Sequence, residues 1–224
     1  MQTVYYSLMQ NLLAFLLLAA AAICLPAQNN GKGSDPTHAS IVDSHEGVTI
    51  GVEPWTQASR YKDKFPKKSP LNGGVVAIHA SFRNDNEYGV KVDLKSIRLL
   101  VQINEDNRQE IAPLSAEDVA DTVLLKANGK DPTAKRVPLP IPVGKPKPAR
   151  DANWTSLRDA CQNAAVPSSV LAAHSTVEGL IYFDLRGEVE LLQTSHLYVP
   201  NLATMGENQP LSYFDIDLSR ALSN

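Results

Sequence analysis

Apolar and polar residues alternate along much of the chain, and this pattern predicts β-strands. The clearest run is Gly74–Arg83. A strand has a side-chain period of two, so such a run presents one buried face and one face in water. The buried face is predicted to hold Val76, Ile78, Ala80 and Phe82, and the wet face Ala77, His79, Ser81 and Arg83. This assignment places His79 in water and outside any buried site.

Further strands are predicted on both sides of this run. The first is His45–Val52, ended by Pro54-Trp55. After Gly74–Arg83, the alternation changes parity near Lys95-Ser96, which requires a bulge or a short turn there. Gly179 indicates a bulge or a close backbone approach within the late strand. The remaining predicted strands are Val90–Leu94, Ile97–Ile103, Val177–Leu185, Glu188–Gln193, His196–Val199 and Leu211–Leu218.

Two segments have helical rather than strand periodicity. Ser115–Ala127 begins with Ser115 and Asp118, which approximate a capping box, and ends before Gly129. Trp154–Ala165 ends before Pro167 and places Leu157, Cys161 and Ala164 on one side. Cys161 is therefore interpreted as a small buried apolar residue rather than a reactive or intermolecular thiol.

The order of these elements predicts a mainly β fold. Seven or eight strands occur at short spacing with two short helices between them, and no strand–helix–strand rhythm of a parallel sheet is present. Two packed antiparallel sheets in an immunoglobulin-like β-sandwich fit this order best. The predicted sandwich carries a Pro-rich inserted loop at 131–150, which is either a contact segment for a peptide ligand or the envelope, or, the favoured interpretation, a loop lying across the surface.

The N-terminus predicts export. The first 31 residues contain no charged side chain, and Leu8–Ala27 is almost entirely apolar. Leu25-Pro26-Ala27 followed by a polar stretch is typical of a signal-peptide cleavage site. The predicted organisation is a signal peptide at 1–27, a flexible tether at 28–43 and a β-sandwich domain at 44–224, located in the periplasm or outside the cell. An uncleaved membrane anchor is the alternative, whereas a lipoprotein is disfavoured because Ile23 precedes Cys24.

Composition excludes some partners. The 224-residue chain has a formal net charge of −3 and no basic stripe interleaved with aromatic residues, so nucleic acid is not expected as a partner. After the signal segment no other stretch is apolar enough to span a membrane. Cleavage would leave Cys161 alone, so no internal disulfide is expected. The basic run Arg60–Pro70 is either a contact for an anionic surface or, the favoured interpretation, a solvated loop.

Candidate chemistry is sparse. The sequence has no motif for a serine nucleophile, a zinc-binding helix, a phosphate-binding loop or a dinucleotide fold. Asp43, His45 and Glu46 form the one compact cluster of potential metal ligands. Alternation places Asp43 and His45 on one strand face and Glu46 on the other, so a polar strand entry is favoured. We therefore predict no catalytic residue, no metal ligand and no cofactor.

Two regions carry a resemblance to a known family. The run from Ser175 to Leu185, which reads polar-Val-x-Gly-x-apolar-x-Phe, is similar to a late strand of bacterial exported immunoglobulin-like proteins. The pairing of Val76–Asn84 with Val90–Val101 also resembles the telokin-like, DUF4352-type sandwiches. The Pro-rich insertion and the two helices depart from that pattern. The resemblance implies an envelope binding or structural module and carries over no catalytic residue.

Three functional hypotheses follow. The first is a non-catalytic exported module that binds a protein or another envelope partner. The second is a hydrolase or metal-dependent enzyme with scattered residues, which requires a deep pocket with convergent titratable groups. The third is an accessory protein that keeps Leu8–Ala27 as a membrane anchor. The sequence carries no signal for an oligomeric state.

Export makes the first testable prediction. We expect protein recovered from cell fractions to be soluble and to begin at Gln28, as measured by intact mass and N-terminal sequencing. A membrane-bound species that retains Leu8–Ala27 would instead support the anchored protein.

Overall fold

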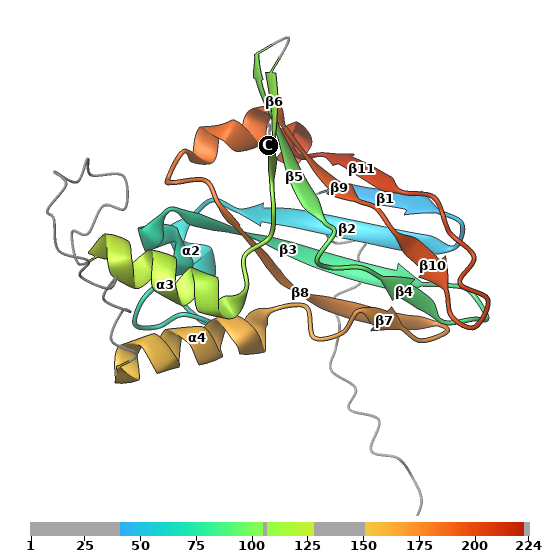
Figure 1. The fold of residues 1–224 in the computed structure, drawn as a ribbon, viewed down its shortest axis with the longest axis horizontal. Helices are drawn as coiled ribbons and strands as arrows, with labels where there is room; N and C mark the ends of the chain where they lie inside the picture. Colours follow the sequence, from blue (N-terminus) through green and yellow to red (C-terminus); the bar gives the residue numbers. More distant parts are fainter. Residues whose placement is uncertain (1–40, 105–106, 128–150, 222–224) are drawn as a thin grey trace, which may run out of the picture. The chain divides into compact units, whose positions relative to one another are not determined.

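The domain is a mainly β, antiparallel sandwich. The computed structural model describes residues 41–104, 107–127 and 151–221, and the predicted signal peptide and the Pro-rich segment 131–150 lie outside them. In this part of the chain eleven strands form three antiparallel sheets, which pack as two layers (Figure 1). No helix in these ranges is both long enough and apolar enough to cross a bilayer.

One layer is a four-stranded sheet with the order β1-β2-β3-β8. Each neighbouring pair is antiparallel, and β3 pairs along its whole length with β8. Short segments cover part of the outer edge of β8, because Leu114 bridges to Tyr182 and Ala165 bridges to Leu180. The strands are β1 (Ile41–His45), β2 (Val48–Trp55), β3 (Val75–Asn84) and β8 (Ser175–Asp184).

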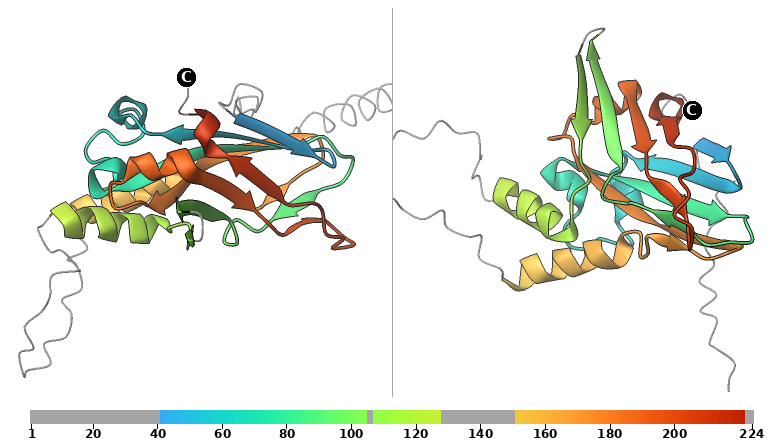
Figure 2. Two further views of the ribbon diagram at one scale, coloured as in Figure 1. Left: turned by 90° about the horizontal axis from the view of Figure 1, so that it is seen from above. Right: turned by 45° about the vertical axis from the view of Figure 1, so that its right-hand side comes forward.

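The other layer contains two sheets, one of four strands and one of three. The first has the order β11-β9-β5-β6 and the second β10-β4-β7. The hairpin of β5 and β6 projects from the body of the domain (Figure 2). The strands are β4 (Val90–Val92), β5 (Arg98–Asn104), β6 (Asn107–Ile111), β7 (Val170–Leu171), β9 (Ser195–Val199), β10 (Leu202–Thr204) and β11 (Phe214–Asp217).

The parity change predicted near Lys95-Ser96 is confirmed as a turn. The chain leaves β4 in one sheet and enters β5 in the other through the turn after Val92. The Ser96 hydroxyl donates to Asp93 Oδ2 at 2.5 Å, and this hydrogen bond lowers the pKa of the Asp93 carboxyl. The turn therefore lets both strands direct their apolar residues into the same core.

The main core lies between the two layers. Alternate side chains of β2, β3 and β8 meet those of β4, β5, β9 and β11, and nearly all of them are inaccessible to water. Burial of this kind stabilises a domain by about 25 cal/mol per Å² of apolar surface. Its largest fully buried members are Phe82, Phe183, Phe214, Ile50, Ile78, Ile97, Leu99, Leu171, Leu192 and Leu197.

A second core covers the opposite face of the four-stranded sheet. Helices α3 (Ala116–Ala127) and α4 (Ala152–Ala164) lie side by side against one end of this face (Figure 1). The prediction of a wet face on β3 is therefore wrong, since Ala77 is 0% exposed and Ser81 1%. The alternation of residues along a strand separates its two faces. It does not show whether a layer of helices covers the second face. The residues of this core include Trp55, Tyr61, Val75, Ala77, Val119, Trp154, Leu157, Cys161, Leu180 and Tyr182.

The two helices are held by the groups that the sequence indicated. Ser115 and Asp118 form the predicted capping box, with Asp118 N donating to Ser115 Oγ at 3.2 Å. Trp154 Nε1 donates to Asp121 Oδ1 at 2.7 Å and links α4 to α3. Cys161 is fully buried, as predicted, and desolvation raises the pKa of its thiol to about 12.

Several predicted boundaries are wrong. The predicted strand His45–Val52 crosses the Glu46-Gly47 turn between β1 and β2, and Ile41–Asp43, assigned to the tether, belong to β1. The strand was predicted to stop at Val52, but β2 continues to Trp55, so Pro54-Trp55 belongs to the strand. Glu188–Gln193 is not a strand, because Val189–Thr194 forms a 3₁₀ helix, η4. The remaining short helices are α2 (Ala58–Tyr61), η3 (Pro70–Gly73) and η5 (Leu218–Ala221).

Tyr61 closes the end of the β2–β3 ladder. Its buried hydroxyl donates to the carbonyl of Trp55 at 2.8 Å and accepts from the amide of Ala77 at 2.9 Å. These two residues form the last register pair of the two strands. Burial raises the pKa of Tyr61 to about 12, so the hydroxyl keeps its proton at neutral pH and can serve both strands.

We expect Tyr61→Phe to lower the free energy of unfolding by roughly 1–3 kcal/mol, because it leaves two buried backbone groups without a partner. Urea unfolding monitored by circular dichroism measures this loss. Tyr213→Phe is the matched control, since Tyr213 is 60% exposed and should change stability little. Equal stability of the two variants would contradict the role given to Tyr61.

Candidate functional site

A groove of about 520 Å³ opens at one end of the sandwich, where three loops meet. The turn between β1 and β2 contributes Glu46, the turn between β3 and β4 contributes Asn86 and Tyr88, and the loop between β10 and β11 contributes most of the remainder. Loops at the end of a rigid sandwich are common positions for binding residues. We call this the loop-end groove, and its lining residues are Glu46, Asn86, Tyr88, Thr204, Met205, Glu207, Gln209, Pro210 and Leu211.

Asn84 organises the loops from beneath. It is the last residue of β3 and is 0% exposed. Its Nδ2 donates to the carbonyls of Tyr88 at 2.8 Å and Ala172 at 2.9 Å, while its Oδ1 accepts from the amide of Asn86 at 3.1 Å. One buried side chain thus fixes the β3–β4 turn and ties it to the segment before β8. Buried polar groups satisfied in this way rigidify the structure around them.

The β1–β2 turn is held against the β3–β4 turn. Asn86 Nδ2 donates to the Glu46 carbonyl at 3.0 Å, and the amide of Asp85 donates to the Gly47 carbonyl at 2.8 Å. Gly47 has a φ of 74°, and a Cβ at this position would lie 2.4 Å from Asn86 Oδ1. Glycine suits this backbone conformation, and a larger residue would also displace the side chain of Asn86. The two turns therefore form one unit.

The third loop is attached by backbone and side-chain bonds. The amide of Met205 donates to the Gly89 carbonyl at 2.8 Å, and the amide of Gln209 donates to Thr204 Oγ1 at 3.1 Å. The amide of Ser212 donates to Glu46 Oε2 at 2.7 Å, which connects the loop after β10 to the first turn. The groove is consequently formed by the fold itself, before any ligand arrives.

The chemical character of the groove is acidic and partly apolar. Glu46 and Glu207 supply carboxylates, and Asn86 and Gln209 supply amides. Tyr88 and Met205 are 42% and 47% exposed, so they present apolar surface beside these polar groups. No lysine or arginine is among the described residues that line the groove. Such a lining suits a ligand that is neutral or positively charged and has an apolar part.

The predicted cluster of Asp43, His45 and Glu46 separates in the structure. His45 Nε2 lies 3.1 Å from Asp43 Oδ2 and the His45 ring packs 4.8 Å from that of Phe214. Glu46 has a φ of 48° in the following turn and directs its carboxylate to Ser212 and the groove. Across the described ranges no group of three or more His, Cys, Asp or Glu residues is placed to hold a metal ion.

The other histidines in the described ranges are also dispersed. His196 Nδ1 lies 2.9 Å from Asp215 and His174 Nε2 lies 3.1 Å from Glu87, each on a different part of the surface. His79 does not point into open water as predicted, because its ring stacks on Trp55 at 6.2 Å and lies 3.8 Å from Glu178. Desolvation lowers the pKa of His79 below 6.5, and Glu178 opposes this effect.

Two further cavities lie beside the helices. One, of about 480 Å³, borders the edge of β8 between Leu94, Leu114, Val166 and Ile181. Its walls are mainly apolar, and a Cβ on Gly179 would lie 2.4 Å from the amide nitrogen of Val166, which confirms the predicted close approach. The other is a small pocket between α4 and the basic loop after α2.

The loop-end groove was missed by the sequence prediction, although signals for it were present. Asn84-Asp85-Asn86 and Glu46-Gly47 are turn sequences that follow alternate strands. In an antiparallel sheet such turns lie at the same end, so their convergence follows from connectivity. Met205 and Glu207 come from a third loop after a strand, β10, that was not predicted, and their position depends on long-range packing.

Comparisons with known proteins add no function. No family model matches the chain, and no curated protein matches it. A crystal structure described as a functionally unknown protein from Listeria monocytogenes EGD-e aligns over 79% of each chain, with 15% identity and a TM-score of 0.37. A likeness of this extent carries no argument about what the chain binds or does.

We expect Asn84→Ala to destabilise the domain by roughly 1–3 kcal/mol and to loosen the loop-end groove, because buried carbonyl groups lose their donor. Urea unfolding gives the first quantity, and amide hydrogen exchange at Asn86–Gly89 gives the second. Asn163→Ala, at an exposed position of α4, serves as the control and should leave exchange in these turns unchanged. Unaltered exchange in Asn84→Ala would contradict the organising role of Asn84.

His79 should titrate below pH 6.5, because burial favours its neutral form. Because the folded-state pKa of His79 lies below its unfolded-state value, folding favours the neutral imidazole. The stability that His79 contributes is therefore fully present above about pH 6.5 and is lost as the pH falls toward the folded-state pKa. NMR titration of the imidazole measures the shift. Glu178→Gln should lower the pKa of His79 further, and a rise in that variant would contradict the assignment.

Proposed function

We propose that the protein is an exported, non-catalytic binding module that holds a cationic segment of a protein partner in the loop-end groove. The observation that carries this proposal is the groove itself. Its three loops are fixed by Asn84, Asn86 and backbone hydrogen bonds. Binding of a ligand would therefore cost little conformational entropy in these loops. Export rests on the apolar leader Leu8–Ala27 and is part of the same proposal.

Charge favours a cationic ligand. Glu46 and Glu207 line the groove, and no lysine or arginine is among its described lining residues. Tyr88 presents an exposed ring of the kind that attracts lysine and arginine, and Met205 presents a flexible thioether that adapts to varied side chains. A lysine- or arginine-bearing peptide would use both properties at once, whereas an anion would be repelled by the two carboxylates.

The geometry gives less support to catalysis. Hydrolytic sites bring a base, a nucleophile and a stabilising donor within hydrogen-bonding reach of one another. The described histidines lie on separate elements, each beside its own carboxylate, and none lines the loop-end groove. The groove is open rather than deep. These features support binding over the alternative of an enzyme with scattered residues.

The test is binding of short peptides that vary in lysine and arginine content, with glutamate-substituted versions for comparison. We expect saturable binding of the basic peptides, measured by calorimetry or by NMR shifts at Tyr88 and Met205. Tyr88→Ala combined with Glu207→Gln should weaken it about tenfold, because a cation–π contact and a charge pair are lost.

Tyr213→Ala combined with Glu110→Gln is the matched control. Both of its residues are exposed and lie outside the groove, and the net change in charge is the same. An equal loss of peptide affinity in the two double variants would show a general electrostatic effect rather than a specific binding site. Absence of saturable binding by every basic peptide would overturn the proposal.

A further inference from the structure

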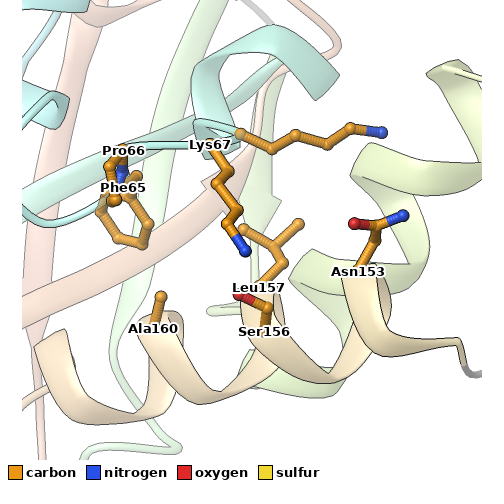
Figure 3. Close-up of a pocket in the computed structure, with 8 residues that line it drawn as sticks. Phe65, Pro66, Lys67, Asn153, Ser156, Leu157 and Ala160 are labelled. Carbon is orange, nitrogen blue, oxygen red and sulfur yellow. The ribbon is translucent and has the colours of Figure 1, made fainter.

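A small pocket lies between α4 and the loop that follows α2. Its cavity volume is about 80 Å³, far below the roughly 300–1,000 Å³ of sites that enclose a whole small molecule. The buried side chains of Phe65 and Leu157 form part of its wall, and Lys67 extends from the loop toward Ser156 and Leu157 of α4 (Figure 3). The pocket therefore has room for one functional group of a ligand.

The loop side of this pocket is basic. Lys67 and Lys68 line it, and Lys62 and Lys64 belong to the same loop. None of these four lysines forms an ion pair with the described part of the chain. Arg60, by contrast, is already paired with Glu53 on β2. Four ammonium groups in seven residues, with Asp63 as the one acid among them, create a local positive potential.

The helix side of the pocket adds hydrogen-bonding groups without a negative charge. Asn153, Ser156 and Ala160 recur at helical spacing along α4 and face the loop. The nearest acids of α4 are engaged elsewhere, since Asp151 accepts from the amide of Trp154 at 2.8 Å and Asp159 pairs with Arg158 at 2.8 Å. An anion entering the pocket would meet lysine ammonium groups, a hydroxyl and a side-chain amide, alongside the apolar side chains of Phe65, Pro66, Leu157 and Ala160.

We propose that this pocket binds a single phosphate ester group, with Lys67 and Lys68 supplying the charge and Ser156 and Asn153 the directed hydrogen bonds. Lysine is a common phosphate-binding residue that acts as a point charge, and a phosphoryl group matches a cavity of this size. The site lies apart from the loop-end groove and does not depend on the function proposed for it. A phosphate ester can belong either to a lipid headgroup or to a soluble molecule.

The full chain as recovered from producing cells is titrated with inorganic phosphate, with glycerol phosphate and with vesicles of phosphatidylglycerol. Phosphatidylcholine vesicles serve as the zwitterionic comparison. We expect saturable shifts of the Ser156 and Asn153 amide signals with glycerol phosphate. Lys67→Gln combined with Lys68→Gln should weaken binding about tenfold, because two charge-assisted contacts are lost.

Lys62→Gln combined with Lys64→Gln is the matched control, because it removes the same charge from the same loop at positions that do not line the pocket. A loss below about threefold, as expected for screened surface charges, supports the pocket. Equal loss in the two double variants would show a diffuse basic surface and overturn the proposal, as would shifts that do not saturate.

The vesicle measurements identify the source of the phosphate. Binding to phosphatidylglycerol vesicles that depends on Lys67 and Lys68 supports a lipid headgroup. Saturable binding of glycerol phosphate without vesicle binding supports a soluble phosphate ester. Each protein variant is first compared with the parent by thermal unfolding, because Lys67 is exposed whereas Lys68 is half-buried.

Discussion

The structure depends on the burial of one sheet from both sides. Strands β2 and β3 form the centre of the four-stranded sheet, and seven of the eight residues of β2 are buried. Their inner face meets the second layer, while part of their outer face meets α3 and α4. A domain of this length could not leave both faces of such apolar strands in water. The two helices are therefore a structural requirement of the sheet rather than an addition to it.

This arrangement divides the molecule between rigid strands and positions where recognition can occur. At one end of β2 the ladder is closed by Tyr61, next to the helix layer and the basic loop. At the other end, β3 finishes at Asn84, whose side chain binds the turns together. A strand end normally leaves its loops free to move. Here a fully buried amide holds the turns that line the groove in a defined geometry.

Much of the fold could be read from the sequence because it depends on local periodicity. The strand Val75–Asn84, the two helices with the Ser115 cap, and the turn after Val92 are all visible in patterns of fewer than 14 residues. The errors have equally local causes. Glu46-Gly47 reverses the chain inside a continuous alternating pattern, and Val189–Thr194 forms a 3₁₀ helix where three apolar residues suggested a strand. The face of His79 was predicted correctly but its exposure was not, because Trp55 and Glu178, which cover it, are distant in the sequence. The candidate groove could not be assembled in advance, since Met205 and Tyr88 meet only through folding.

The length of β2 sets the distance between two oppositely charged parts of the surface. The acidic groove precedes this strand and the basic loop follows it, so eight residues of extended chain separate them by about 26 Å. Opposite charges fixed at that separation give the two ends of this strand different local electrostatic potentials. A negatively charged layer would attract one end and repel the other, and the torque would turn the molecule before any contact formed. The domain would then arrive with its groove facing away from that layer, and added salt would abolish this preference.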